Sequence, residues 1–191
     1  MQRHGLAAAQ ASIIAAESGQ LFLEVVRFDR EGESGRRCMV SLEAVQAEFT
    51  GSQHAWPLAL QQLVKQKRLS ADDADRGTLQ WAFGRLIANG DMHPGNLSFF
   101  ASNGELSLTP AYDMLPMSFA PNSAGHMRDR PPELQLDITL GQACWQTALD
   151  MAREYWQSLA DIPGCSDDFR RIAAAMQQPL NALSGQIERM A

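Results

Sequence analysis

The order of apolar and polar positions divides the chain into a β-rich beginning and a helical remainder. Residues 20–28 are mostly apolar, β-branched or aromatic, which is typical of a buried strand. Residues 1–19 are rich in alanine and favour a helix by propensity, but Gly5 interrupts them. A hairpin that pairs residues 11–16 with the following strand is the alternative. A charged, glycine-containing loop is predicted for residues 29–37.

Two short helices are predicted next. After a strand at residues 38–40, Ser41 can cap a helix that carries Glu43 in its first turn and ends near residue 50. A second helix is predicted for residues 56–67, because apolar positions recur at helical spacing and its end is basic.

The most regular helix follows Ser70. Asp73 stands three residues later, so the pair forms a carboxylate variant of the capping box. We expect the helix to end at Asn89–Gly90 and so to deliver the polar loop that comes next. Its apolar face has three- and four-residue spacing: Leu79, Ala82, Phe83, Leu86 and Ile87.

The second half of the chain returns to helices after one more hairpin. Residues 97–100 and 106–108 flank Ser102-Asn103-Gly104, a hairpin signal. Residues 109–132 contain five prolines and little periodicity, which predicts a long loop. Two helices are predicted to close the chain, at residues 142–159 and 167–190, the second kinked or broken at Pro179. The predicted fold class is α+β and predominantly helical.

Composition narrows the class of protein. A chain of 191 residues suits one domain or one lobe of a larger one, and its net charge of -6 argues against a general polyanion-binding surface. Its three cysteines form no closely spaced pair, so we expect reduced thiols. We find no apolar run long enough to span a bilayer and no signal peptide. A soluble, cytoplasmic protein is expected.

The candidate chemistry is concentrated between residues 89 and 113. Asp91, His93 and Asn96 stand in a loop rich in turn formers, and Asp113 follows the predicted hairpin. An amide and a carboxylate suit a hard cation such as Mg²⁺ that keeps several waters. Taken singly, any of these residues is commonly a turn residue that bonds its own backbone. For His93 we consider a proton carrier or a metal ligand, but favour a brace that holds the loop by hydrogen bonds.

The order of these groups indicates phosphoryl transfer. Asp91 and Asn96 are five residues apart, the spacing of the Asp and Asn in the catalytic loop of protein kinases. A second Asp after a hairpin then occupies the place of the Asp in the kinase D-F-G motif. Asp91, Asn96 and Asp113 reproduce that order, which makes a set of unrelated turn residues a poorer interpretation.

These motifs resemble those of a known family. The stretch N-G-D-M-H-P-G-N-L-S-F-F, followed by L-T-P-A-Y-D-M-L, is similar to the catalytic region of HipA-like serine/threonine kinases of bacterial toxin–antitoxin systems. V-V-R-F-D-R at residues 25–30 looks like that family's hinge between lobes, and V-S-L-E-A follows at residues 40–44. The similarity covers most of the chain and favours the hairpin interpretation of residues 7–27.

The resemblance implies a role for each matched residue. Asp91 would be the catalytic base with His93 beside it, and Asn96 and Asp113 would bind Mg²⁺. The backbone of Val26–Phe28 would meet the adenine of ATP, and Asp29 would lie near the ribose. The family usually has Glu where Val26 stands, a change that backbone contacts can tolerate.

The resemblance also implies a division of the chain. Residues 1–40 would be a hairpin and hinge remnant of the N-terminal lobe, and residues 41–191 the helical catalytic lobe. The family's phosphate-binding loop and nucleotide-anchoring Lys lie upstream of the hinge, and residues 1–28 contain no Lys. We therefore expect weak nucleotide binding and little phosphotransfer unless an upstream segment is supplied.

Two rival functions remain at this point. The sequence G-D-x-H-P-G-N also resembles aminoglycoside and choline kinases, although Asn89 and P-A-Y-D-M-L differ from their usual motifs. The other rival is a non-catalytic module that binds a partner protein. The partners implied by the resemblance are a protein substrate, of which an aminoacyl-tRNA synthetase is one candidate, and a DNA-binding antitoxin. Direct nucleic-acid or membrane binding is not expected.

Overall fold

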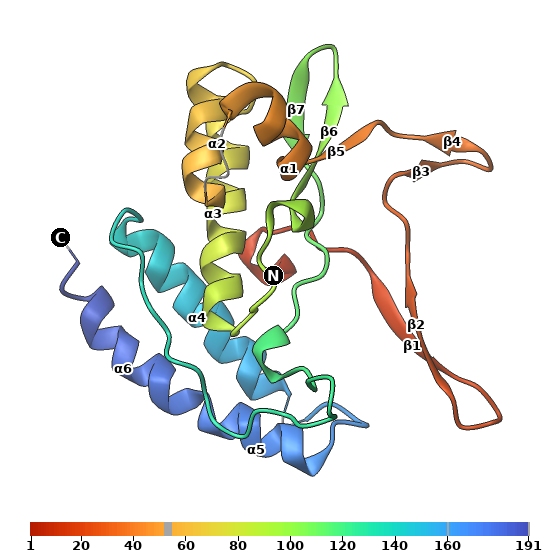
Figure 1. Cartoon of the computed structure of the whole chain (residues 1–191), viewed down its shortest axis with the longest axis vertical. Helices are drawn as coiled ribbons and strands as arrows, with labels where there is room; N and C mark the ends of the chain where they lie inside the picture. Colours follow the sequence, from red (N-terminus) through yellow and green to blue (C-terminus); the bar gives the residue numbers. More distant parts are fainter. Residues whose placement is uncertain (52–54, 160, 191) are drawn as a thin grey trace. The chain divides into compact units, whose positions relative to one another are not determined.

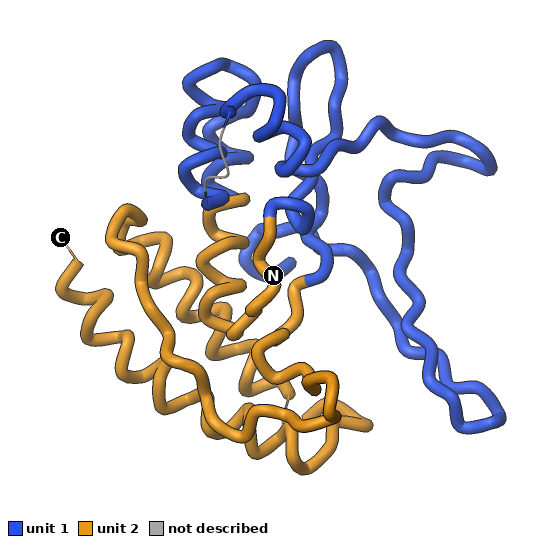
Figure 2. The backbone as a smooth tube through the Cα atoms, in the orientation of Figure 1, with its two compact units in different colours: residues 1–76, 94–113 blue, residues 77–93, 114–191 orange. Residues whose placement is uncertain are grey.

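A computed structural model describes residues 1–51, 55–159 and 161–190. The chain forms two compact units, drawn in different colours in Figure 2. Unit 1 contains residues 1–76 and 94–113, and unit 2 contains residues 77–93 and 114–191. We describe each unit by itself.

Unit 1 begins with the predicted hairpin. After a 3-10 turn at Gln2–His4 (η1), strands β1 (Ala11–Ala15) and β2 (Leu21–Val25) pair antiparallel, with Ile13 opposite Leu23. This confirms the hairpin over the alanine-rich helix. In Figure 1 the two strands form a ribbon that extends away from the β5–β7 sheet of the same unit.

The prediction that the second strand is buried was wrong. Every residue of β1 and β2 is exposed, including Ile13 (72%), Leu21 (70%) and Leu23 (69%). Residues opposite each other in an antiparallel pair point to the same face. One face of the hairpin is therefore wholly apolar: Ala11, Ile13, Ala15, Leu21, Leu23 and Val25. We call this set the hairpin face.

The rest of unit 1 is organised on a three-stranded antiparallel sheet in the order β5–β6–β7. Its turn between β6 and β7 has positive φ at Asn103 (51°) and Gly104 (83°), the conformation that an Asn-Gly hairpin requires. The predicted loop before the sheet contains two short paired strands. The strands are β3 (Arg30–Glu31), β4 (Gly35–Arg36), β5 (Met39–Ser41), β6 (Ser98–Ser102) and β7 (Glu105–Leu108).

Short helices complete unit 1. Ser41 caps α1 (Leu42–Val45) by accepting a 3.3 Å hydrogen bond from the Ala44 amide, as predicted. A π-helical turn, η2 (Gln46–Thr50), continues α1 and ends at Gly51. Helix α2 (Trp56–Lys65) buries Trp56, Leu60 and Leu63 but leaves Leu58 46% exposed.

Helix α3 (Ala71–Leu86) starts in unit 1 and ends in unit 2. The hydroxyl of Ser70 accepts a 3.0 Å hydrogen bond from the Asp73 amide, which confirms the predicted cap. The predicted stop at Asn89–Gly90 is one residue late, because Ala88 has the positive φ of 60°. The Asn89 amide bonds the Gly84 carbonyl and the Ala88 amide bonds the Arg85 carbonyl, which together form a Schellman motif.

Unit 2 is helical around an aromatic core. Trp145 and Trp156 of α4 (Gln142–Ser158) are buried, and α4 lies beside α6 (Gln177–Ile187) in Figure 1. Helix α5 (Asp167–Ala175) precedes α6 and is capped by Ser166. The break between them lies at Met176 rather than at Pro179, because a proline is tolerated in the first turn of a helix.

The long segment between Asp113 and α4 is irregular apart from a 3-10 turn, η4 (Met117–Phe119). Phe119 is buried and makes an edge contact with Trp156 at 5.9 Å between ring centroids. In the part of the chain that the structure describes, no helix is both long and apolar enough to cross a bilayer.

Candidate catalytic site

The four residues predicted to carry the chemistry fall in different units. Asp91 and His93 belong to unit 2, directly after the end of α3, whereas Asn96 and Asp113 belong to unit 1. Two residues of the chain, Pro94 and Gly95, separate His93 from Asn96.

Asp91 is held by its own backbone and presents its side chain to solvent. Its amide donates a 3.0 Å hydrogen bond to the Oδ1 atom of Asn89, a buried residue at the end of α3. Its carboxylate is 53% exposed, and His93 Nε2 lies 3.9 Å from Oδ1. A carboxylate in this position is accessible to a hydroxyl group of a substrate, as a general base requires. At 3.9 Å this contact is too long for a hydrogen bond, so the role of His93 as a brace stays a prediction.

Within unit 1, Tyr112 links the segments that carry the two candidate metal ligands. Its hydroxyl donates a 2.8 Å hydrogen bond to the carbonyl oxygen of Gly95, the residue before Asn96. Tyr112 also precedes Asp113 in the chain. The Tyr112 phenol therefore links the segment of Asn96 to the segment of Asp113.

A third partner fixes the direction of these hydrogen bonds. The Tyr112 hydroxyl lies 2.6 Å from the Ser98 hydroxyl. A carbonyl can only accept, so the single phenol proton goes to Gly95 and Ser98 donates to Tyr112. Burial raises the pKa of Tyr112 above its usual value, and the nearby charge of Asp113 acts in the same direction. The phenol thus stays protonated at neutral pH and remains a donor.

Asp113 has an uncommon backbone conformation. Its φ is 55°, in the left-handed region, which Asp visits more readily than most residues but still at a cost. Such conformations cluster at functional sites, where the surrounding structure imposes them. The exposed side chain of Asp113 and the half-exposed side chain of Asn96 supply oxygen donors of the type that Mg²⁺ prefers.

Further carboxylate or imidazole ligands do not gather around this pair. Over residues 1–51, 55–159 and 161–190, no three His, Cys, Asp or Glu side chains form a metal-binding group. Asn96 and Asp113 fit a magnesium ion that keeps most of its waters and shares the phosphates of a nucleotide.

The predicted nucleotide-binding residues also lie in unit 1. The ring of Phe28 contacts Tyr112 at 6.0 Å and Phe100 at 6.1 Å between centroids. The hinge segment is therefore packed on the same tyrosine that links the candidate metal ligands. The amide of Val26 donates a 2.9 Å hydrogen bond to the Gln10 carbonyl, while its side chain is 56% exposed.

Asp29 is engaged in an ion pair. Both of its carboxylate oxygens accept 2.7 Å hydrogen bonds from Arg27, and Arg37 donates its amide to the Asp29 carbonyl. The bidentate Arg27 contact lowers the pKa of the Asp29 carboxyl below its usual value. A ribose hydroxyl would have to share or displace this guanidinium group.

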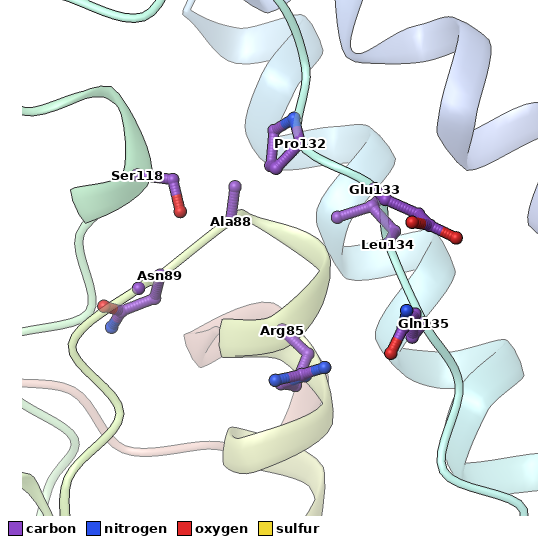
Figure 3. Close-up of a pocket in the computed structure, with 9 residues that line it drawn as sticks. Arg85, Ala88, Asn89, Ser118, Pro132, Glu133, Leu134 and Gln135 are labelled. Carbon is purple, nitrogen blue, oxygen red and sulfur yellow. The ribbon is translucent and has the colours of Figure 1, made fainter.

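A cavity of about 120 Å³ adjoins the loop of Asp91 within unit 2. Figure 3 shows the end of α3 with Arg85 and Ala88 on one side and the extended Pro132–Gln135 segment on another, with Ser118 also at its wall. Asn89 and Gly90, the residues just before Asp91, complete the lining. The segment that follows Asp113 thus lines the same cavity as the residues just before Asp91.

Tyr112 is the residue that the sequence interpretation missed. The signal was present in P-A-Y-D, where a tyrosine precedes the candidate metal ligand. Its partner Gly95 is seventeen positions away, so no local pattern reveals the hydrogen bond.

Comparisons with known proteins agree with the resemblance of the motifs. The family model for the HipA-like C-terminal domain matches residues 1–187. The chain is 43% identical over 186 residues to Toxin YjjJ of Escherichia coli (strain K12), covering 97% of this chain and 42% of that protein. The chain thus spans about two-fifths of the length of this curated relative.

A solved structure shares the fold. It comes from the Shewanella oneidensis MR-1 toxin–antitoxin complex of HipA, HipB and operator DNA. The match has a TM-score of 0.66 at 18% identity and covers 99% of this chain and 55% of the other. Together with the family model and the 43% identical relative, it shows that the chain belongs to the family of HipA-like C-terminal domains.

Proposed function

We propose that the chain is the catalytic lobe of an ATP- and Mg²⁺-dependent serine/threonine protein kinase of the toxin type. The observation that carries the proposal is the Tyr112 link. It ties Gly95, next to Asn96, to the segment of Asp113, and Phe28 of the hinge packs on the same ring. This arrangement supports the proposal that one residue of unit 1 organises two oxygen ligands and a nucleotide-binding segment.

The proposed roles follow from the chemistry of each group. Asp91 is the base that orients or deprotonates the attacking hydroxyl group, and the exposed position of its carboxylate suits that role. Asn96 and Asp113 hold Mg²⁺, which would neutralise charge on the phosphates of the bound nucleotide. The backbone of Val26–Phe28 meets adenine. His93 braces the loop that follows Asp91.

The hairpin face supports a requirement for a further segment. A two-stranded hairpin is marginally stable by itself, and six apolar residues on one exposed face need a cover. We propose that an upstream lobe covers this face and supplies the phosphate-binding loop and the anchoring Lys. This chain alone is then expected to bind nucleotide weakly and to transfer phosphate slowly.

Two partners belong to the proposal. The solved neighbour is a complex of HipA with HipB and operator DNA, which supports a HipB-like antitoxin as partner. The net charge of -6 is unsuited to direct DNA contact, so the antitoxin would contact the DNA. The protein substrate, with an aminoacyl-tRNA synthetase as one candidate, rests on the family resemblance.

Calorimetric titration with Mg-ATP tests the proposal. We expect weak binding by the chain, loss of that binding in Asp113→Ala, and no change in Asp129→Ala, a matched removal of an exposed loop carboxylate. Asp91→Asn should bind Mg-ATP like the parent chain. Absence of heat at millimolar nucleotide would favour a non-catalytic module that binds a partner protein.

A turnover measurement tests the need for the upstream lobe. Phosphate transfer from ATP by the chain alone should stay below about 1 s⁻¹, the low end of the usual kinase range. A faster rate would overturn this part of the proposal and leave the assignment of Asp91, Asn96 and Asp113 standing.

A further inference from the structure

Gly84 lies two residues before the end of α3, and two side chains of unit 2 approach it closely. A Cβ atom at this position would lie 2.5 Å from the Sδ atom of Met92 and 2.7 Å from its Cε atom. It would also lie 3.1 Å from the Cε atom of Met114. Real Cβ atoms essentially never approach other atoms to within 3.0 Å, so any other residue here would push aside the flexible end of the Met92 side chain.

The two methionines are direct sequence neighbours of the candidate catalytic residues. Met92 lies between Asp91 and His93, and Met114 directly follows Asp113. Gly84 thus receives the side-chain ends of one residue from each of the two segments that carry catalytic candidates. Thioether side chains are flexible and fill irregular gaps, so their position depends on the shape of the surface that receives them.

Two neighbouring contacts hold the same segments together. The amide of Ser118 donates a 3.0 Å hydrogen bond to the Ala88 carbonyl, at the Schellman end of α3. Gly90 is a second close approach, since a Cβ there would lie 3.1 Å from the Ser118 Oγ atom. The segment after Asp113 therefore packs against α3 at Gly84 and against the loop of Asp91 at Gly90.

We propose that Gly84 is a positioning residue whose missing side chain lets Met92 and Met114 pack against α3, and so sets the backbone of the Asp91 loop and of the segment that begins at Met114. The inference rests on the proposed function for its catalytic meaning. A glycine inside a helix lowers helix stability relative to alanine, so its presence at this position calls for a compensating role.

The test compares Gly84→Ala with Gly185→Ala in the full chain. Gly185 lies inside α6, where an added Cβ would meet only the end of the flexible Arg189 side chain at 3.4 Å. Gly185→Ala should raise the midpoint of thermal unfolding and leave the rate of phosphate transfer unchanged. Gly84→Ala should lower the rate of phosphate transfer about tenfold, because a displacement of a catalytic group by about 1 Å can cost about a hundredfold in rate. A purely structural role would instead lower the thermal midpoint and leave the rate of the folded protein unchanged.

A rescue experiment separates the positioning role from a general packing defect. Met92→Ala removes the atoms that clash with the new Cβ, so Gly84→Ala should have little further effect in that background. If Gly84→Ala alone fails to fold, restored folding in Gly84→Ala/Met92→Ala with a phosphate-transfer rate below that of the parent supports the positioning role of Met92, whereas restored folding with the parental rate overturns it. Failure of the double variant to recover overturns it.

An NMR measurement keeps this inference distinct from the proposed function. Backbone amide shifts of Asp91, His93 and Asp113 should change in Gly84→Ala and stay constant in Gly185→Ala. Unchanged shifts at all three would overturn the inference even if Mg-ATP binds. Changed shifts in a chain that binds no Mg-ATP would support the positioning role and reject the kinase proposal.

Discussion

The hydroxyl of Tyr112 donates a 2.8 Å hydrogen bond to the carbonyl oxygen of Gly95 and so joins the two segments that hold Asn96 and Asp113. Removing that hydroxyl group leaves the Gly95 carbonyl and the Ser98 hydroxyl without this partner. We expect Tyr112→Phe to lower the free energy of unfolding by about 1 kcal/mol, the usual net value of a hydrogen bond.

The same substitution should weaken Mg-ATP binding, because it loosens the spacing of Asn96 and Asp113. Urea unfolding and calorimetry measure the two effects. Tyr155→Phe is the matched control, since Tyr155 lies in unit 2. Tyr112→Phe with parental Mg-ATP affinity would show that the link has no part in ligand binding.

The chain contains two tyrosines, so their titration can be followed by phenolate absorbance. Burial raises the pKa of Tyr155 to about 12, with the Cys165 thiol adding a smaller effect, and burial also raises the pKa of Tyr112. Both groups should therefore titrate above the usual value near 10 in the folded chain and at about 10 in urea.

The free energy of unfolding should depend on pH through the same two tyrosines. The unfolded chain loses its phenol protons at lower pH than the folded chain, so the stabilising contribution is complete below about pH 10. It is then lost as pH rises through the folded values, up to about 12 for Tyr155. Tyr155→Phe should remove the upper step of the absorbance titration. A single native step near pH 10 would contradict the burial of both rings.

Ala88 adopts a positive φ of 60° at the end of α3, a conformation that glycine reaches without a steric cost. Ala88→Gly should therefore raise the free energy of unfolding by roughly 0.5–1 kcal/mol, after the added entropy of the unfolded chain is subtracted. Ala174→Gly, at an exposed position inside α5, should lower it by about the same amount. Denaturant unfolding of both variants gives the comparison, and equal signs would refute the Schellman assignment.

The hairpin face should be dispensable for the fold of this chain but not for its solubility. Ile13→Thr and Leu23→Thr keep β-forming residues while they remove apolar surface, and each should change the unfolding free energy by less than about 0.5 kcal/mol. Binding of a hydrophobic dye and self-association, measured by ultracentrifugation, should both decrease. Ser12→Thr, on the opposite face, should change neither. A loss of several kcal/mol would mean that the hairpin face is already covered.

Local signals in the sequence predicted local structure well. The Ser70 cap with its Asp73 partner and the Asn103-Gly104 turn need only neighbouring residues, and both are present as expected. Asp91, His93 and Asp113 lie in loops as predicted, whereas Asn96, predicted in the same loop, is the last residue of a 3-10 turn, η3 (Pro94–Asn96). Whether they act as proposed stays a prediction.

Features that depend on distant parts of the chain could not be predicted. The composition of residues 21–25 suggested burial, but burial depends on what covers a strand, and the residues that the structure describes leave this strand exposed. Ala88 rather than Asn89 took the left-handed conformation, because the Schellman bonds fix the place of the stop. No pattern of neighbouring residues places the side-chain ends of Met92 and Met114 against Gly84.

The meeting of two thioethers at Gly84 has an oxidative consequence. A sulfoxide adds a polar oxygen to methionine. The Met92 sulfur lies only 2.5 Å from the point where a Cβ atom of residue 84 would stand, so little space is left for that oxygen on the side of α3. Mild peroxide treatment should therefore disturb the Asp91 loop as Gly84→Ala does, and methionine sulfoxide reductase should reverse it. Met92→Leu should confer resistance, because leucine has no sulfur atom to oxidise.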